Sequence, residues 1–129
     1  MAKAIINFCL NSTDTKEVMF ETEGIVKVVD NKTIIDFIEQ TELKLHTKVI
    51  ISSTKVVIER TGKVEMQLVC DYLKDDFVYM KIDKEYEISM INHTILLDVK
   101  DDNILVIYQT EMDKENNTTH QLKLSWKYI

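Results

Sequence analysis

The chain has 129 residues with a net charge of −6, and 45% of its residues are hydrophobic and 29% are charged. These values are typical of one globular domain with a single core, and we expect that domain to span residues 1–129. No apolar run approaches the roughly 20 residues of a membrane span, and an acidic chain is a poor match for a phosphate backbone. We therefore expect a cytoplasmic location and no nucleic-acid or membrane partner.

Alternation of apolar and polar residues, the period of a β-strand, runs through most of the chain. It predicts nine or ten strands, with one ambiguous segment at residues 33–40, where Ile34 and Ile38 oppose Ile35, Phe37 and Glu39. Gly24, in the middle of a long strand, predicts a bulge or a sharp bend. Besides this ambiguous segment, the expected strands are residues 3–10, 17–29, 43–52, 55–60, 64–70, 77–82, 86–91, 94–99, 104–108 and 120–129. Asn92-His93 is interpreted as a turn between two of them.

Residues 55–70 form the clearest pattern, two alternating strands joined at Thr61-Gly62. Glycine can adopt the positive φ that tight hairpin turns require. Arg60, the only arginine among 16 basic residues, has the same parity as Val56 and Ile58. The pattern therefore predicts a guanidinium that points into the core.

Many short strands with short connections favour an all-β fold, an antiparallel up-and-down β-barrel of about 8–10 strands. Closure removes the exposed edges of the sheet, which favours a barrel over the alternative, a sandwich. No segment shows the 3.6-residue period of a helix.

Arg60 is the leading candidate for a binding residue, because arginine suits two-pronged pairing with a carboxylate and lysine replaces it poorly there. Glu39, on the face of Phe37, is its expected partner. Three readings stay open: a structural ion pair inside the barrel, a site for the carboxylate or phosphate of a small ligand, or a register that leaves both residues outside. Thr22, Thr47 and Tyr108 are either polar points of a ligand pocket or satisfied core residues.

Other chemistry has little support in the sequence. His46, His93 and His120 are isolated, and Cys9 and Cys70 lack metal-type spacing, so we expect no metal site and two buried free thiols. Asp75-Asp76 and Asp101-Asp102 are interpreted as solvated turns. No nucleophile turn or glycine-rich phosphate loop is present in a chain with two glycines. We expect no cofactor and no catalysis.

Several short motifs resemble those of the YwiB-like family, small bacterial proteins of unknown function with a calycin-like, lipocalin-type β-barrel. They are Thr22-Glu-Gly24, Phe37-Ile-Glu39, Thr47, Ile58-Glu-Arg-Thr-Gly62 followed by Met66, then Tyr108 and Leu124-Ser-Trp126. Ile82-Asp-Lys84 stands where that family has an aromatic-glycine pair. The resemblance implies the fold, a pocket and an aromatic plug at Trp126, and it implies no reaction.

The leading hypothesis is a barrel that binds a small amphipathic or anionic ligand in its interior without catalysis. It predicts an open mouth and a cavity of at least about 300 Å³. The alternative is a packed barrel that acts as a protein interaction or self-association module, such as a homodimer, with Ile34, Ile38 and Ile50 as exposed apolar candidates. A hydrolase or isomerase that uses Glu39 ranks third.

Overall fold

The computed structural model describes residues 1–113 and 115–129, and in this part of the chain ten antiparallel strands close into a barrel. Each strand pairs with the next along the chain, and β1 closes the barrel against β10. The up-and-down topology expected from the short connections is confirmed. The strands are β1 (Ala2–Ser12), β2 (Thr15–Val29), β3 (Lys32–Ile38), β4 (His46–Ile51), β5 (Lys55–Thr61), β6 (Val64–Asp71), β7 (Asp76–Ile82), β8 (Tyr86–Val99), β9 (Asn103–Glu111) and β10 (Asn117–Tyr128).

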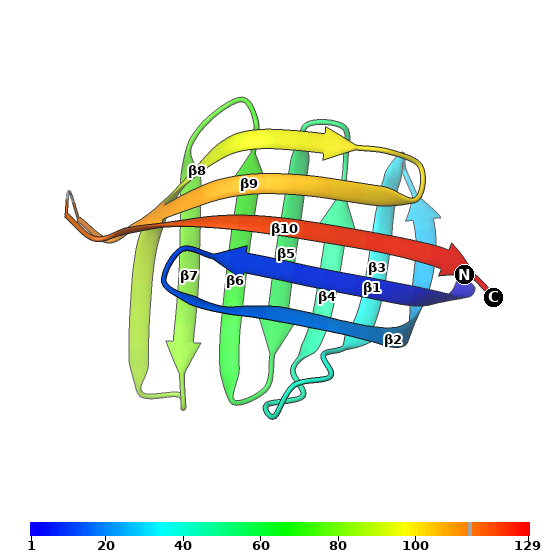
Figure 1. Ribbon diagram of the computed structural model, residues 1–129, viewed down its shortest axis with the longest axis horizontal. Helices are drawn as coiled ribbons and strands as arrows, with labels where there is room; N and C mark the ends of the chain where they lie inside the picture. The colour runs from blue at the N-terminus through cyan, green and yellow to red at the C-terminus, as the bar shows by residue number, and fades with distance from the viewer. Residues whose placement is uncertain (114) are drawn as a thin grey trace.

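The barrel is flattened into two sheets whose strands cross (Figure 1). Strands β1, β9 and β10, with most of β2, run across the front, and strands β3 to β7 stand upright behind them. The long strands β2 and β8 belong to both sheets: β2 pairs first with β1 and then with β3, and β8 pairs first with β7 and then with β9. Crossed packing of this kind needs strands that bend at the corners.

Gly24 stands at the corner made by β2. Its pairing with both neighbours is regular, with Ala4 on β1 and Phe37 on β3, so of the two predicted features the bulge is absent and the bend is present. A Cβ at this position would lie 2.6 Å from the carbonyl oxygen of Asp36 and 2.9 Å from Cγ1 of Ile6. The glycine is required because the backbones of β2 and β3 approach closely where the barrel folds over.

A β-bulge between Thr94 and Leu96 makes the other corner. The prediction of two strands separated by a turn at Asn92-His93 is wrong, because β8 is continuous from Tyr86 to Val99. Asn92 points inward, and its amide donates to the carbonyl oxygen of Val69 at 2.8 Å. A buried asparagine with a partner can continue a strand, and sequence pattern alone cannot distinguish it from a turn asparagine.

The apolar interior is continuous from one sheet to the other. Leu43, between β3 and β4, and Val28, near the end of β2, continue the apolar alternation but are 49% and 67% exposed. The predicted hairpin is confirmed, with Gly62 at a φ of 147° between β5 and β6. The fully buried apolar side chains are Ala4, Ile6, Ile35, Val49, Val56, Cys70 and Val106, each 0% exposed.

Candidate functional site

A set of polar side chains gathers inside one end of the barrel, which we call the polar rim. In an up-and-down barrel, odd strands end and even strands begin at the same end, so inward residues at those positions become neighbours. This end receives inward residues from the ends of β1, β5 and β9, from the position that follows β3, and from the starts of β4 and β10. The polar rim consists of Ser12, Glu39, Thr47, Arg60, Tyr108, Thr110 and His120.

The predicted pair of Arg60 and Glu39 forms inside the polar rim. Nε of Arg60 lies 2.7 Å from Oε2 of Glu39, and the Thr47 hydroxyl donates to the same oxygen at 2.5 Å. The Nε–H bond does not point along this contact, so the pair is held by charge more than by a linear hydrogen bond. Glu39 and Thr47 are buried, at 5% and 0% exposure. The reading that leaves both charges outside the barrel is therefore wrong.

The outer end of the Arg60 side chain is free. Among the described residues, no acceptor forms a hydrogen bond to its two terminal Nη atoms, and the side chain keeps 18% of its exposure. The guanidinium carbon lies 6.0 Å from the centre of the Phe8 ring, which stacks on Phe20 at 4.8 Å. Arg60 thus uses one nitrogen on Glu39 and leaves its two Nη atoms without an acceptor among the described residues.

His120 is a member of the polar rim that the sequence analysis missed. Its Nδ1 lies 2.6 Å from Oγ of Ser12, its Nε2 lies 2.9 Å from Oγ1 of Thr110, and its ring stacks on Tyr108 at 4.7 Å. A neutral imidazole donates from one nitrogen and accepts at the other, so the two hydroxyls can satisfy it completely. The signal was its parity with Leu122, Leu124 and Trp126, which placed it inside.

Burial and the nearby guanidinium act on the titrating groups of the polar rim. Burial lowers the pKa of His120, the charge of Arg60 lowers it further, and Asp14 opposes this. Burial also raises the pKa of Tyr108, while Arg60 opposes that shift. His120 is therefore neutral at pH 7, and Arg60 supplies the positive charge of the rim.

Two of the predicted site residues lie apart from this group. Thr22 is partly exposed and accepts a hydrogen bond from Gln40 at 3.3 Å. Trp126 pairs with Ile6 near the opposite end of the barrel, is 4% exposed, and has an indole N–H without a partner among the described residues. The role of Trp126 as a plug stays a prediction.

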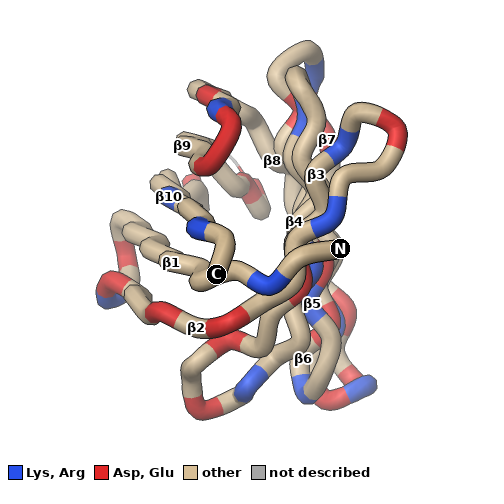
Figure 2. Tube along the Cα trace, turned by 90° about the vertical axis from the view of Figure 1, so that its right-hand side faces the viewer, with Lys and Arg blue, Asp and Glu red and all other residues tan. Residues whose placement is uncertain are grey.

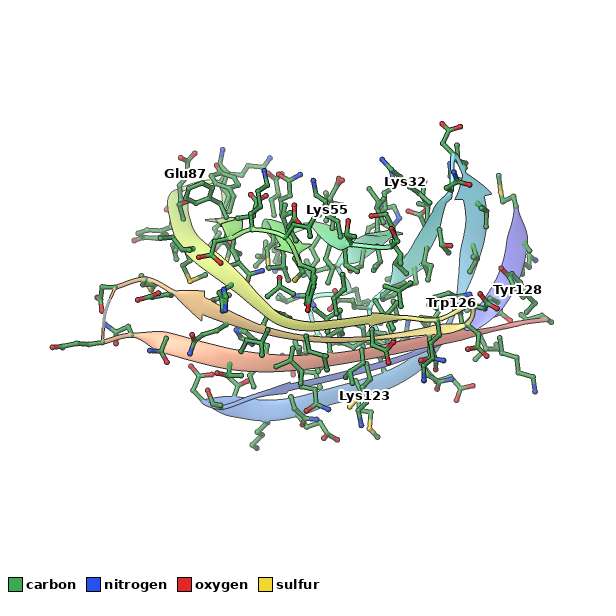
Figure 3. All side chains as sticks on the ribbon, turned by 90° about the horizontal axis from the view of Figure 1, so that it is seen from above. Lys32, Lys55, Glu87, Lys123, Trp126 and Tyr128 are labelled. Atoms are coloured by element: carbon green, nitrogen blue, oxygen red, sulfur yellow. The ribbon has the colours of Figure 1, made fainter. Side chains whose placement is uncertain are left out.

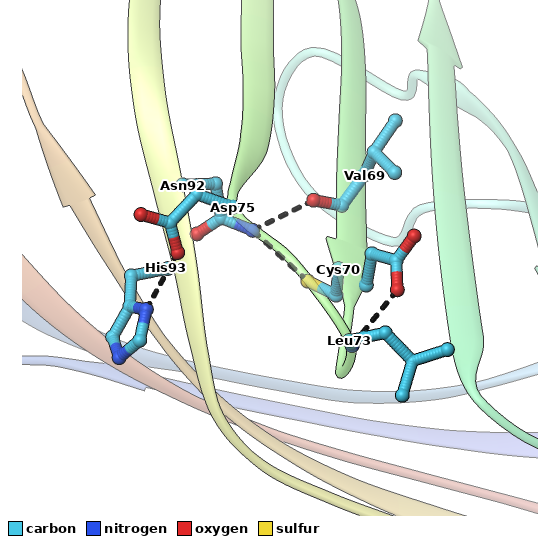
Figure 4. A network of polar contacts seen from close by, with 7 residues as sticks. Val69, Cys70, Leu73, Asp75, Asn92 and His93 are labelled. Carbon is cyan, nitrogen blue, oxygen red and sulfur yellow. Dashed lines mark hydrogen bonds and ion pairs between the residues drawn. The ribbon is translucent and has the colours of Figure 1, made fainter.

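A second polar network lies where β8 leaves β7 (Figure 4). Asn92 donates to the carbonyl oxygen of Val69 and contacts Sγ of Cys70 at 3.4 Å, while Nδ1 of His93 lies 2.7 Å from Asp75. Burial raises the pKa of the Cys70 thiol to about 12, with Asn92 opposing. A small cavity of about 190 Å³ lies beside Thr94 and the turn of residues 71–75. The Cys70 thiol is therefore structural and unreactive in the folded chain.

The larger of the two described cavities is a groove on the outside of the barrel, with a volume of about 650 Å³. Its walls are outward residues of β2, β1, β10, β9 and β8, including Met19, Cys9, Lys123, Leu105 and Asp98. We call it the outer groove. Neither described cavity lies inside the barrel, so the expected interior cavity is not found there. Apolar side chains fill the space beneath Arg60.

The described residues also limit the other chemistries that were considered. They include no cluster of three or more His, Cys, Asp or Glu side chains placed to hold a metal ion. They contain no helix long and apolar enough to cross a membrane. Basic and acidic residues are interspersed on the side shown in Figure 2 and do not gather into a single basic face.

Comparison with known proteins supports the fold. No protein-family model matches the sequence, and no curated protein matches it. The structure is similar to the crystal structure of the ywiB protein from Bacillus subtilis, with a TM-score of 0.73, 17% sequence identity, and coverage of 98% of this chain and 92% of that one. At this identity the likeness shows the fold alone. The resemblance seen in the short motifs is thus confirmed as a shared, complete barrel fold of the YwiB type.

Proposed function

We propose that the polar rim binds a small amphipathic anion without catalysis. The observation that carries this proposal is the fork of Arg60, whose side chain is 18% exposed and whose Nη atoms have no acceptor among the described residues. A carboxylate or phosphate can accept two parallel hydrogen bonds from such a fork. Glu39 and Thr47 hold the guanidinium in place, so little side-chain entropy is lost when the anion arrives.

The apolar part of the ligand packs against partly buried side chains that surround Arg60. Leu10, Val18, Phe20, Met66 and Met90 contact the core from this side of the barrel without being fully buried. Methionine side chains are flexible and adapt to irregular shapes. The ligand therefore lies at the mouth and displaces these side chains, and it needs no empty chamber deep in the barrel.

Binding without chemistry suits the groups that surround the anion site. The only carboxylate of the polar rim is engaged by Arg60 and Thr47. Both nitrogens of His120 face hydroxyls, and the described residues place no carboxylate against its ring to orient it as a base. We accordingly propose a binding protein of the cytoplasm. Arg60 supplies most of the affinity for the anion, and the other residues of the polar rim determine which ligand shapes fit.

The proposal is tested with anilinonaphthalene sulfonate, a fluorescent probe that is both anionic and apolar. A hydrogen bond to a charged group contributes about 1.5 to 3 kcal/mol, so Arg60→Met should weaken binding by about 10-fold or more. Arg60→Lys keeps the charge and loses the fork, so its affinity for the probe should lie between those of wild type and Arg60→Met. Lys123→Met, in the outer groove, is the matched control and should leave the affinity unchanged.

Probe binding that is insensitive to Arg60→Met but lost in Lys123→Met would refute the proposal and move the site to the outer groove. Circular dichroism of each variant shows that the barrel is intact, so a loss of affinity is not a loss of fold. Native mass spectrometry of freshly purified protein, beside the same sample denatured, then identifies the chemical class of any ligand that accompanies the chain.

A further inference from the structure

An apolar row crosses the outside of the upright sheet, on the face opposite the outer groove. Ile34 pairs with Ile50, Ile50 with Val57, and Val57 with Val69, and Phe77 pairs with Ile91 farther along the same line. All of these side chains point outward, because their chain neighbours face the core. We call this row the apolar stripe. It spans six neighbouring strands, or about 24 Å at the usual strand spacing.

The exposed part of the apolar stripe is largest at β7 and β8. Phe77 is 63% exposed and Ile91 is 46% exposed, and Tyr79 beside them is 40% exposed. Exposed apolar surface bordered by polar residues marks interaction sites, and large aromatic side chains contribute most of the binding energy at such sites. The other members of the row, Ile34, Ile50, Val57 and Val69, are partly buried. Single exposed apolar residues are ordinary, whereas an outward apolar row across six strands is not.

Charged residues flank the apolar stripe in a fixed order. On β3 the outward residues at and beside the stripe are Lys32, Ile34 and Asp36, and on β5 they are Lys55, Val57 and Glu59. These strands run in the same direction, because each is antiparallel to β4. Both lysines therefore lie on one side of the stripe and both acids on the other. Figure 3 shows Lys32 and Lys55 on this outer face and Lys123 on the opposite one.

We infer that the apolar stripe docks on the apolar stripe of a second copy of this chain. A two-fold axis along the stripe places each residue of one flank against the opposite flank of the partner. Lys32 then meets Asp36 of the partner subunit, and Lys55 meets Glu59 of the partner subunit. Lys48, which lies between the two acids, meets the neutral Ser52 of the partner subunit.

This arrangement favours a second copy over an unrelated partner because the surface is complementary to itself. The two-fold axis that lays one stripe on the other also brings two lysines of each subunit against two acidic residues of the partner subunit. On β3, β4 and β5 it places no two like charges against each other. Phe77 packs on its own symmetry mate. The inference does not depend on ligand binding at the polar rim, since the stripe lies on the outside of the sheet.

The test is sedimentation velocity over a range of protein concentrations, with variants on exposed positions that leave the core intact. Wild type should dimerise reversibly, and Phe77→Glu should raise the dissociation constant by about 30-fold or more, the expectation for a large aromatic residue that an interface buries. Met19→Glu, equally exposed on the other sheet, is the matched control and should not change it.

A charge exchange tests the symmetry itself. Lys55→Glu and Glu59→Lys should each weaken the dimer, and the double variant should restore it, because each contact joins Lys55 of one copy to Glu59 of the other. A monomer at all concentrations up to about 100 µM, the weak range of specific association, would overturn the inference. A dimer that resists Phe77→Glu but dissociates in Met19→Glu would overturn it as well, by placing the interface on the outer groove.

Discussion

The two ends of the barrel interior are built from opposite kinds of residue. Away from the polar rim, in the part of the interior that we call the closed end, Ile6, Ile35 and Val49 are 0% exposed and belong to the apolar core. At the polar rim, a charged pair, a histidine and four hydroxyl groups share the inward parity of the apolar core residues. The same strand alternation turns the apolar residues and the polar rim residues inward. The two ends therefore differ in which residues occupy the inward positions and not in the backbone.

This contrast indicates which part holds the fold and which part can bind. Burying a large aliphatic side chain stabilises the chain by about 1.5 to 3 kcal/mol, whereas an ion pair taken out of water contributes little or even costs free energy. A barrel selected for stability alone would continue the aliphatic packing to both ends. The polar residues of the rim therefore stabilise the barrel less than aliphatic residues would, which is expected of a binding site.

The largest expected effect tests the closed end. Ile35→Ala removes a fully buried side chain and should lower the free energy of unfolding by about 2 to 5 kcal/mol. Ile38→Ala, on the same strand but 51% exposed, should lower it by less than about 1 kcal/mol. Urea unfolding of both variants gives the comparison, and equal losses would contradict the assignment of the stable core.

The ion pair at the polar rim should behave differently from the aliphatic core. Arg60→Met leaves Glu39 buried without its counter-charge and should lower the free energy of unfolding by about 2 to 3 kcal/mol, less than for a fully buried pair because Arg60 is partly exposed. The double variant Arg60→Met with Glu39→Met should recover most of this loss. A double variant as unstable as the single one would show that the pair stabilises the barrel in its own right.

The smallest expected effect is a dependence of stability on pH through His120. Its pKa in the folded chain is lowered from the ordinary value of 6.5, so the unfolded chain binds a proton first as the pH falls. Stability should be constant with respect to this group above about pH 6.5 and should decrease as the pH falls from there toward the folded pKa. Thermal unfolding of His120→Gln should lack this decrease, and His93→Gln, exposed on β8, should retain it.

Much of this architecture follows from strict alternation in the sequence. Parity alone predicts the inward position of Arg60 beside Ile58 and of Glu39 beside Phe37, and the scarcity of glycine focuses attention on Gly24 and Gly62. These predictions hold because a one-residue slip would turn each apolar face toward water. Local pattern is therefore enough to assign most of the interior.

The errors arise where a long-range contact decides the outcome. Asn92 reads as a turn residue, and only the carbonyl of Val69 and the thiol of Cys70 explain its place inside a strand. His120 reads as isolated because its partners, Ser12 and Thr110, come from other strands. At Gly24 the pattern left a bulge and a sharp bend open, and only the pairing of β2 with both β1 and β3 distinguishes them. Side-chain partners across a closed sheet cannot be read from spacing along the chain.

The most direct test of binding at the polar rim is a titration of the ¹⁵N-labelled chain with anilinonaphthalene sulfonate, followed by amide chemical shifts. We expect the largest changes around Arg60, Met66 and His120, and small ones around Ile35 and Val49 at the closed end. Changes centred on Cys9 and Lys123 would place the ligand in the outer groove and contradict the account.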